Sequence, residues 1–280
     1  MSFNVLSLFD GISCGQIALE QAGVAYDRYY ASEIDKHAIK VTQKNYPYTD
    51  QVGDVANIRV LPGEISLLLG GSPCQGFSSI GKGLNFEDPH SKLFFEFVRI
   101  MKEAEPKYFL LENVPMKAAY RDVISSYMGV EPIEINSSTV SAQNRLRLYW
   151  TNIPRKHLLR NAQEYLDDVI DHSYTGYRVP LNWEKRVPAD LPKYCDPYNK
   201  KEIKHKSTAL RTNVNNGNMW IRVPDGYRNL SRREAEKLQT VPAGYTDAVS
   251  ESQAKKMLGN GWTVAVISHL LRGIKCSEES

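Results

Sequence analysis

One stretch constrains this chain most: a short apolar run that stops at two glycines and is followed directly by serine, proline and cysteine. The run Ile65–Leu69, bounded by glycine and proline, is typical of a fully buried strand. Open α/β sheets bind their ligands beyond the carboxyl ends of the strands, and Cys74 follows such an end. The stretch therefore predicts a reactive cysteine at a ligand-binding edge. A buried structural cysteine is the alternative, because free cysteine often packs as a small apolar side chain.

Cysteine usage and composition narrow the class of protein. The four cysteines stand far apart and form no C-x-x-C pair, which argues against structural zinc and against a disulfide framework. The 42% hydrophobic and 24% charged residues are those of an ordinary soluble globular protein. There is no signal-peptide pattern, and no apolar run approaches the ~20 residues that cross a bilayer. We expect a cytoplasmic protein without bound metal and without membrane association.

Charge is distributed unevenly along the chain. Residues 178–233 hold thirteen Lys/Arg against five Asp/Glu, hence +8, and the remainder holds 22 against 27, hence −5. Hydrophobic periodicity also fades from about residue 154. We therefore predict a larger domain built from residues 1–153 and 230–280, and a small, irregular, basic domain over 154–229. Such a basic segment suits a polyanionic partner.

The N-terminal residues resemble a nucleotide-binding unit. A predicted strand, Asn4–Leu8, runs into a glycine-containing turn, and Ser13 with Gln16 predicts a capping box for the helix that follows. Free N–H groups at a helix start, beside glycines, can approach a nucleotide closely. The next predicted strand, Asp27–Ser32, ends in Glu33, which is placed to accept hydrogen bonds from ribose hydroxyls. A helix N-terminal acid, favoured by the helix dipole, would occupy the same position.

Two later strand regions carry polar side chains of interest. A buried strand over Tyr108–Leu111 ends in Glu112, which should reach the same edge as Cys74. In the following extended segment, Arg145 and Arg147 should point the same way, because alternate residues of a strand share a face. Two converging guanidinium groups suit a base edge or a phosphate. A solvent-facing strand edge would have the same pattern.

Regular helices are predicted again after the basic segment. Ser231 with Glu234 and Ser250 with Gln253 predict the N-terminal caps of two helices. Glycine-rich residues 258–262 then interrupt the helical pattern before a final helix.

Taken together, ordered blocks across the whole chain resemble the DNA cytosine-5 methyltransferases. The blocks are FDGISCG (9–15), ASEID (31–35), GDV (53–55), GGSPCQGFS (70–78), ENV (112–114), QNRLR (143–147), REAEKLQ (233–239) and GNGW (259–262). VLSLFDGI, DRYYASE, VGDV and the LGNGWTVAVISHL ending are most similar to the mammalian de novo branch. That branch's chromatin-reading modules are absent, so we expect a compact bacterial or phage enzyme.

This resemblance implies an α/β fold: a doubly wound, mostly parallel sheet that binds S-adenosylmethionine, with a small target recognition domain over 154–229. It implies that Glu33 holds the ribose and Asp54 the adenine amino group. The cofactor-binding residues that it implies are Phe9, Asp10, Gly11, Ile12, Ser13, Gly15, Glu33, Ile34, Asp54, Val55, Pro73, Asn260, Gly261 and Trp262.

The resemblance also implies a catalytic mechanism. The Cys74 thiolate would add to C6 of cytosine and make C5 nucleophilic, because C5 by itself attacks poorly. Glu112 would hydrogen-bond or protonate N3 as charge develops there. Arg145 and Arg147 would hold the flipped base and its phosphate, and the target cytosine must leave the helix to reach the thiolate.

Double-stranded DNA is the implied partner. Arg211 would read a guanine, the commonest specific arginine contact, with Asn213 and Ser78 as further DNA contacts. A tRNA cytosine-5 methyltransferase is the first alternative, but its Cys-Phe-Thr signature is missing here. A catalytically inactive DNA-binding paralogue is the second, although the Pro-Cys pair and the cofactor turn are present. The helix around Phe94 and Phe95 resembles one that self-associates in the de novo branch, which leaves a homodimer open.

Overall fold

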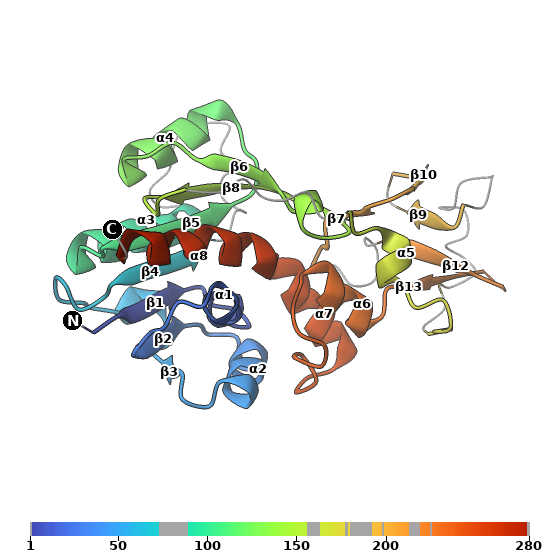
Figure 1. Ribbon diagram of the computed structural model, residues 1–280, viewed down its shortest axis with the longest axis horizontal. Coiled ribbons are helices and arrows are strands. Elements are labelled where there is room, and N and C mark those ends of the chain that lie inside the picture. The colour runs from blue at the N-terminus through green and yellow to red at the C-terminus, as the bar shows by residue number, and fades with distance from the viewer. Residues whose placement is uncertain are drawn as a thin grey trace. The chain divides into compact units, whose positions relative to one another are not determined.

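The chain forms two compact units, and each is described here by itself. The computed structural model describes residues 2–72, 89–155, 163–176, 179, 192–197, 199–212, 219–224 and 226–278 (Figure 1). Unit 1 comprises Met1–Ile135, Leu146–His157 and Ile267–Ser280, and unit 2 comprises Asn136–Arg145 and Leu158–Val266. The sequence placed residues 230–266 with the larger domain, whereas by compactness they group with unit 2. The roles predicted for the two domains stay predictions.

Unit 1 is built on a seven-stranded sheet with the order β3-β2-β1-β4-β5-β8-β6. Its central strands run parallel: β1 pairs with β2 and β4, and β4 pairs with β5. Strand β5 pairs with β8 in the antiparallel direction. The strands are β1 (Asn4–Leu8), β2 (Arg28–Ser32), β3 (Asp50–Gln51), β4 (Leu67–Gly71), β5 (Tyr108–Asn113), β6 (Ile133–Asn136) and β8 (Leu146–Thr151). The predicted α/β fold with a mostly parallel sheet is confirmed.

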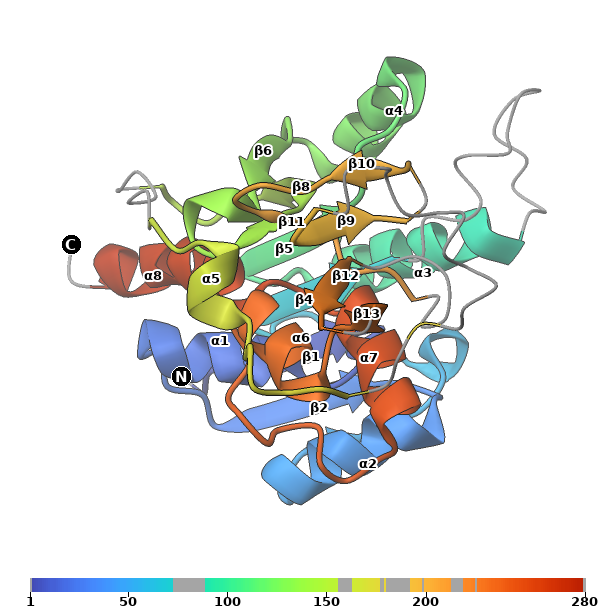
Figure 2. The same cartoon turned by 90° about the vertical axis from the view of Figure 1, so that its right-hand side faces the viewer.

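Helices cover both faces of this sheet. Helix α3 lies against one face, while α1 and α8 lie on the other (Figure 2). The helices are α1 (Cys14–Ala22), α2 (Lys36–Asn45), α3 (Pro89–Ala104), α4 (Ala118–Met128) and α8 (Val264–Glu278), with a 3-10 turn η1 (Val55–Asn57). No helix in the described ranges is both long and apolar enough to cross a membrane.

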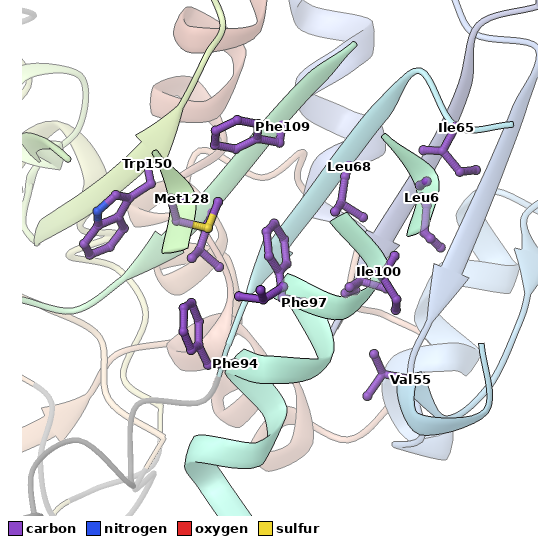
Figure 3. Packing of buried hydrophobic residues seen from close by; sticks show 14 of the residues in the cluster. Leu6, Val55, Ile65, Leu68, Phe94, Phe97, Ile100, Phe109, Met128 and Trp150 are labelled. Atoms are coloured by element: carbon purple, nitrogen blue, oxygen red, sulfur yellow. The ribbon is translucent and has the colours of Figure 1, made fainter. Parts of the chain in front are cut away.

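The main core lies between α3 and the sheet. Figure 3 shows Phe97 of α3 pointing toward β4, with Leu68 and Phe109 close to it. A Cβ atom on Gly70 would lie only 2.8 Å from the Phe97 ring, so this glycine lets the helix approach β4. The strand predicted over Ile65–Leu69 is observed at Leu67–Gly71, so it begins and ends two residues later than expected. Gly70 belongs to the buried strand because the Phe97 ring occupies the space where its side chain would be.

Unit 2 contains an antiparallel sheet that the sequence did not predict. Its order is β10-β9-β12-β13, and a separate two-stranded parallel sheet joins β11 to β7. The elements are α5 (Leu166–Val169), α6 (Arg232–Leu238), α7 (Glu251–Asn260), β7 (Gln143–Asn144), β9 (Tyr194–Asp196), β10 (Lys201–Glu202), β11 (Ser207–Thr208), β12 (Trp220–Val223) and β13 (Gly226–Asn229). Strands of two to four residues are too short to reveal a period.

Buried polar groups organise unit 2. Arg228 and Glu234 form an ion pair at 2.8 Å, and both side chains are 1% exposed. Arg228 also donates to the carbonyl of Asp171. The predicted capping boxes at Ser231 and Ser250 are confirmed, with side-chain and backbone hydrogen bonds made in both directions. Both helices therefore start where the local sequence specifies.

Candidate active site

The candidate site begins at the carboxyl ends of the parallel strands in unit 1. Asp10 follows β1, Glu33 follows β2, Ser72 follows β4, and Glu112 lies at the end of β5. These strands are consecutive neighbours in the order β2-β1-β4-β5. Adjacent strands are about 4.8 Å apart. The four residues therefore line one continuous edge, as predicted for an open α/β sheet.

The turn after β1 has an unusual backbone. Phe9, Gly11 and Ser13 all have positive φ angles, of 56°, 61° and 56°. A non-glycine residue in this region costs of order 1–3 kcal/mol and persists only where the surroundings hold it. Here the Asp10 N–H donates to the Ser32 carbonyl at 3.0 Å, and the Gly11 N–H donates to Glu33 Oε2 at 2.8 Å. Strained backbone of this kind is concentrated at ligand-binding sites.

A buried carboxyl group lies beneath this turn. The Tyr29 hydroxyl donates to Asp10 Oδ1 at 2.7 Å, and the Ser13 hydroxyl donates to Oδ2. Burial raises the pKa of Asp10 to about 6, although the hydrogen bonds from Ser13 and Tyr29 act in the opposite direction. A Cβ atom on Gly15 would lie 2.5 Å from the Tyr29 hydroxyl, so a side chain there would force this pair to move.

The capping box predicted at the start of α1 is wrong. Ser13 has a left-handed conformation and makes no side-chain cap hydrogen bond. Its hydroxyl is used by Asp10 instead, and the Gln16 amide donates to the Ser13 hydroxyl at 3.1 Å and to Thr49 Oγ1 at 2.8 Å. Both residues therefore serve the buried network around Asp10 rather than the helix end. The next residue of the turn, Ile12, is also buried.

Groups suited to an adenosine lie at the ends of β2 and β3. The Glu33 carboxylate accepts three backbone N–H groups at 2.8 Å, from Gly11, Ile34 and Asp35. A carboxylate has about four acceptor sites, so capacity for a hydroxyl donor remains. Ile34 is 75% exposed and offers an apolar surface to a base. The exposed Asp54 carboxylate accepts the Ala56 N–H at 3.0 Å and can still accept an amino group.

Val55 is placed differently from its neighbours. Its side chain is 4% exposed and belongs to the main core. Its carbonyl accepts Arg99 Nη2 at 3.1 Å. Any contact with a cofactor would therefore involve the backbone of Val55.

An ion pair occupies the other end of the edge. Arg147 Nε lies 2.9 Å from Glu112 Oε1, and the two side chains are 14% and 12% exposed. The β5–β8 register opposes Glu112 to Tyr149, two residues from Arg147, so the guanidinium and the carboxylate emerge on one face. A mostly buried carboxylate held by a single arginine is a fixed hydrogen-bonding group.

The segment that leads to Cys74 is held beside this pair. Gly71 is in register with Glu112, and the Asn113 amide donates to Ser72 Oγ at 3.2 Å. Pro73, Cys74, Ser78 and Asn213 lie outside the described residues, so their roles stay predictions. Within the described ranges, no His, Cys, Asp and Glu side chains form a group that could hold a metal ion.

Arg145 does not converge with Arg147, and this expectation is wrong. The Arg145 side chain, in a residue 3% exposed, donates to the carbonyls of Leu210 at 3.1 Å, Gly259 at 3.2 Å and Gly261 at 2.9 Å. The physical reason is a break in the strand. Strand β7 ends at residue 144 and β8 begins at residue 146, so the alternation of faces does not extend across residue 145.

The remaining predicted residues lie in unit 2. Asn260 is exposed at the end of α7, and Gly261 and Trp262 are partly buried in the link to α8. Arg211 is partly exposed, three residues after β11.

Two glutamines that the sequence analysis assigned no role are central to unit 2. Gln143 and Gln239 are both fully buried, and the amide of Gln143 donates to Gln239 Oε1 at 3.3 Å. Gln239 also accepts the Thr263 hydroxyl at 2.9 Å and donates to the Leu258 carbonyl at 2.5 Å. Their presence in the QNRLR and REAEKLQ blocks was the available signal.

The fold and the strand-end site define a doubly wound α/β protein with a ligand-binding edge at the carboxyl ends of its parallel strands. Entamoeba histolytica methyltransferase EhMeth superposes with a TM-score of 0.77 at 16% identity, covering 100% of both chains. The C-5 cytosine-specific DNA methylase family matches residues 3–149 and 120–276. The chain therefore belongs to the family of C-5 cytosine-specific DNA methylases, which are enzymes.

Similar bacterial and phage proteins agree with this assignment. Orphan methyltransferase M.SPRI of Bacillus phage SPR is 39% identical over 181 residues, which cover 58% of this chain and 40% of the phage protein. Type II methyltransferase M1.ScrFI of Lactococcus lactis subsp. cremoris is 27% identical over 299 residues, covering 95% and 76% respectively. The chain thus spans less than half of the first relative and about three quarters of the second. The closer likeness to the mammalian de novo branch stays a prediction.

Proposed function

We propose that this protein transfers a methyl group from S-adenosylmethionine to C5 of a cytosine in double-stranded DNA, with Cys74 as the nucleophile. The observation that carries the proposal is the Arg147–Glu112 pair at the end of β5, in register with the segment that enters Pro73 and Cys74. A carboxyl group fixed beside the start of the cysteine-bearing segment is the arrangement that cytosine activation requires. Family membership supplies the substrate class.

In this proposal each residue of the edge has one task. The Cys74 thiolate forms a bond to C6, and the electron pair of the C5–C6 double bond becomes available at C5. The Glu112 carboxyl group donates a proton to N3, where negative charge develops as the thiolate adds, and takes it back when the thiolate leaves. Arg147 holds the Glu112 side chain in place. After methylation, loss of the C5 proton to solvent re-forms the double bond and expels the thiolate.

S-adenosylmethionine, when bound, supplies the methyl group as an electrophile. The residues that would hold it are those of the strained turn after β1, together with Glu33, Ile34 and Asp54. Their chemistry fits the cofactor, since they combine an exposed apolar surface with two carboxylates that retain acceptor capacity. Asn260, Gly261 and Trp262 stay predicted cofactor contacts. We further expect the enzyme to act in the cytoplasm of a bacterial or phage-infected cell.

Covalent trapping tests the proposal. Fluorine at C5 cannot leave as a proton, so the enzyme should stall as a Cys74–C6 adduct after methyl transfer. We expect an SDS-stable adduct with duplex DNA that contains 5-fluorocytosine, dependent on S-adenosylmethionine and absent in Cys74→Ala. An equally substituted tRNA is the comparison substrate. An adduct with tRNA alone would assign the enzyme to RNA, and no adduct with either would refute catalysis through Cys74.

A further inference from the structure

We propose that Gln143, Arg145 and Gly259 form a backbone clamp that sets the position of residues 210–212 and thereby determines which base beside the target cytosine is preferred. The clamp rests on the proposed function, because it positions the arginine, Arg211, to which DNA reading is assigned. In this proposal Arg145 is a positioning residue that does not touch the flipped base. All of the contacts involved lie within unit 2.

The first observation is that side chains hold both polar backbone groups of Leu210. The Leu210 N–H donates to Gln143 Oε1 at 2.8 Å, and its carbonyl accepts Arg145 Nη1 at 3.1 Å. Gln143 is 0% exposed, Arg145 3% and Leu210 4%. Buried hydrogen bonds to the N–H and to the carbonyl of one residue fix the two peptide groups that flank it, because breaking either bond leaves a polar group unsatisfied away from water. The residue held in this way directly precedes Arg211.

The second observation is a close approach of α7 to the same segment. A Cβ atom on Gly259 would lie 2.6 Å from both the carbonyl carbon and the oxygen of Arg211, and 2.9 Å from the Thr212 nitrogen. Gly259 is the second-last residue of α7 and has no left-handed backbone that would require glycine. The glycine is therefore explained by the backbone packed against it and not by its own conformation.

Arg145 links these two contacts. While Nη1 holds Leu210, Nη2 donates to the carbonyls of Gly259 at 3.2 Å and Gly261 at 2.9 Å. The end of α7 and the segment before Arg211 are thus fixed to one planar group. Lysine would not reproduce this link, because an ammonium group donates from a single atom, whereas Arg145 uses two separate nitrogens of a rigid planar group.

Gln143 is also held in place by contacts that do not involve Arg145. Strands β7 and β11 are parallel, with Ser207 in register with Gln143. The Gln143 amide donates to the Leu238 carbonyl at 2.9 Å, and the Gln239 amide donates to that of Gly261 at 3.2 Å. The Leu238 carbonyl at the end of α6 therefore fixes the orientation of the Gln143 amide, and the Gln143 oxygen in turn fixes the N–H of Leu210.

Such a clamp affects base preference more than general DNA affinity. Reading a guanine edge by a bidentate arginine requires that the side chain be placed within about 0.5 Å, whereas phosphate contacts tolerate displacement. A methyl group forced between Gly259 and Arg211 must move the reading segment by more than that. The preference for the base that Arg211 reads should therefore decrease more than the methylation rate at a preferred site.

Gly259→Ala and Arg145→Lys test the proposal, with one matched control each. Lys256→Ala adds the same residue at an exposed position of α7, and Arg228→Lys makes the same change at a buried arginine of unit 2 that does not contact Leu210. The readout is the ratio of methylation rates on duplexes that differ at one base beside the cytosine. We expect this ratio to fall at least about fivefold in the two test variants. Both controls should keep the wild-type ratio, since a loss of folded protein slows all duplexes equally.

Amide hydrogen exchange at Leu210 and Arg211 gives a readout that needs no activity. Exchange should be faster in Gly259→Ala and Arg145→Lys than in wild type, and unchanged in Lys256→Ala. Wild-type exchange in both test variants would overturn the clamp, and faster exchange with an unchanged ratio would overturn its control of base preference. If the wild-type protein methylates no DNA, the proposed function fails, while the exchange rates still decide whether the clamp exists.

Discussion

Replacing the buried carboxyl group of Asp10 by an amide should change how stability depends on pH. Asp10 is 9% exposed beneath the turn after β1 and receives hydrogen bonds from Tyr29 and Ser13. In Asp10→Asn the amide oxygen can still accept from one hydroxyl, and the amide nitrogen can donate to the other. The variant therefore removes the ionisation while keeping the shape of the site.

The sign and size follow from the pKa of Asp10, which is about 6 in the folded protein against an ordinary value of 3.8. Because the folded pKa is the higher one, the stabilising contribution is complete below pH 3.8 and is lost as the pH rises through 6. The difference between these two pKa values corresponds to about 3 kcal/mol. About 2 kcal/mol of this loss falls between pH 4.5 and 7.5.

Urea unfolding of wild type and Asp10→Asn at a series of pH values measures this contribution of Asp10 to stability. The difference in unfolding free energy between the two should shift by about 2 kcal/mol in favour of the variant from pH 4.5 to 7.5. Asp122→Asn, at an exposed carboxylate of α4, is the control for the change in net charge. Parallel stability curves for wild type and Asp10→Asn would refute the argument that burial controls this group.

Three further predictions concern the site. Glu33→Ala should weaken S-adenosylmethionine binding about 10- to 100-fold in calorimetric titration, because hydrogen bonds to a charged group contribute about 1.5–3 kcal/mol; unchanged affinity would remove Glu33 from the cofactor site. Cys74→Ala should abolish methylation yet keep cofactor affinity, and a loss of binding in the same titration would make Cys74 a structural residue. Arg211→Ala should relax the preference at one base beside the target by about 1–3 kcal/mol in bisulfite sequencing of a plasmid; an equal loss at all sites would identify a phosphate contact.

Features specified by short stretches could be predicted from the sequence. The parallel strands of unit 1 are apolar runs with distinct ends, and the caps at Ser231 and Ser250 depend on residues three positions away. The same rule was wrong at Ser13, because a residue on another strand, Tyr29, completes a competing network around Asp10. Local pattern carries no information about such a partner.

The same distinction between local and distant partners applies to the candidate site. Glu112 could be placed from its strand end, since parallel strands deliver their ends to one edge. The partner of Arg145 could not be predicted, because its three carbonyls belong to residues 65 to 116 positions away in the chain. Helix α4 was also missed, although Gly129 at its end has the left-handed conformation typical of a C-terminal cap.

The division of the chain at residues 145 and 146 has a consequence for engineering. A recognition segment such as 158–229 looks portable, because it is continuous and lies between two blocks of the enzyme. The backbone of Leu210 and Arg211 is nevertheless packed against Gln143 and Gly259, which lie outside that stretch on both sides. A chimera that exchanges only this segment would place a foreign backbone against the Gln143 and Gly259 of the recipient. If the clamp acts as proposed, a transfer of base preference between such enzymes therefore requires moving the clamp residues together with the segment.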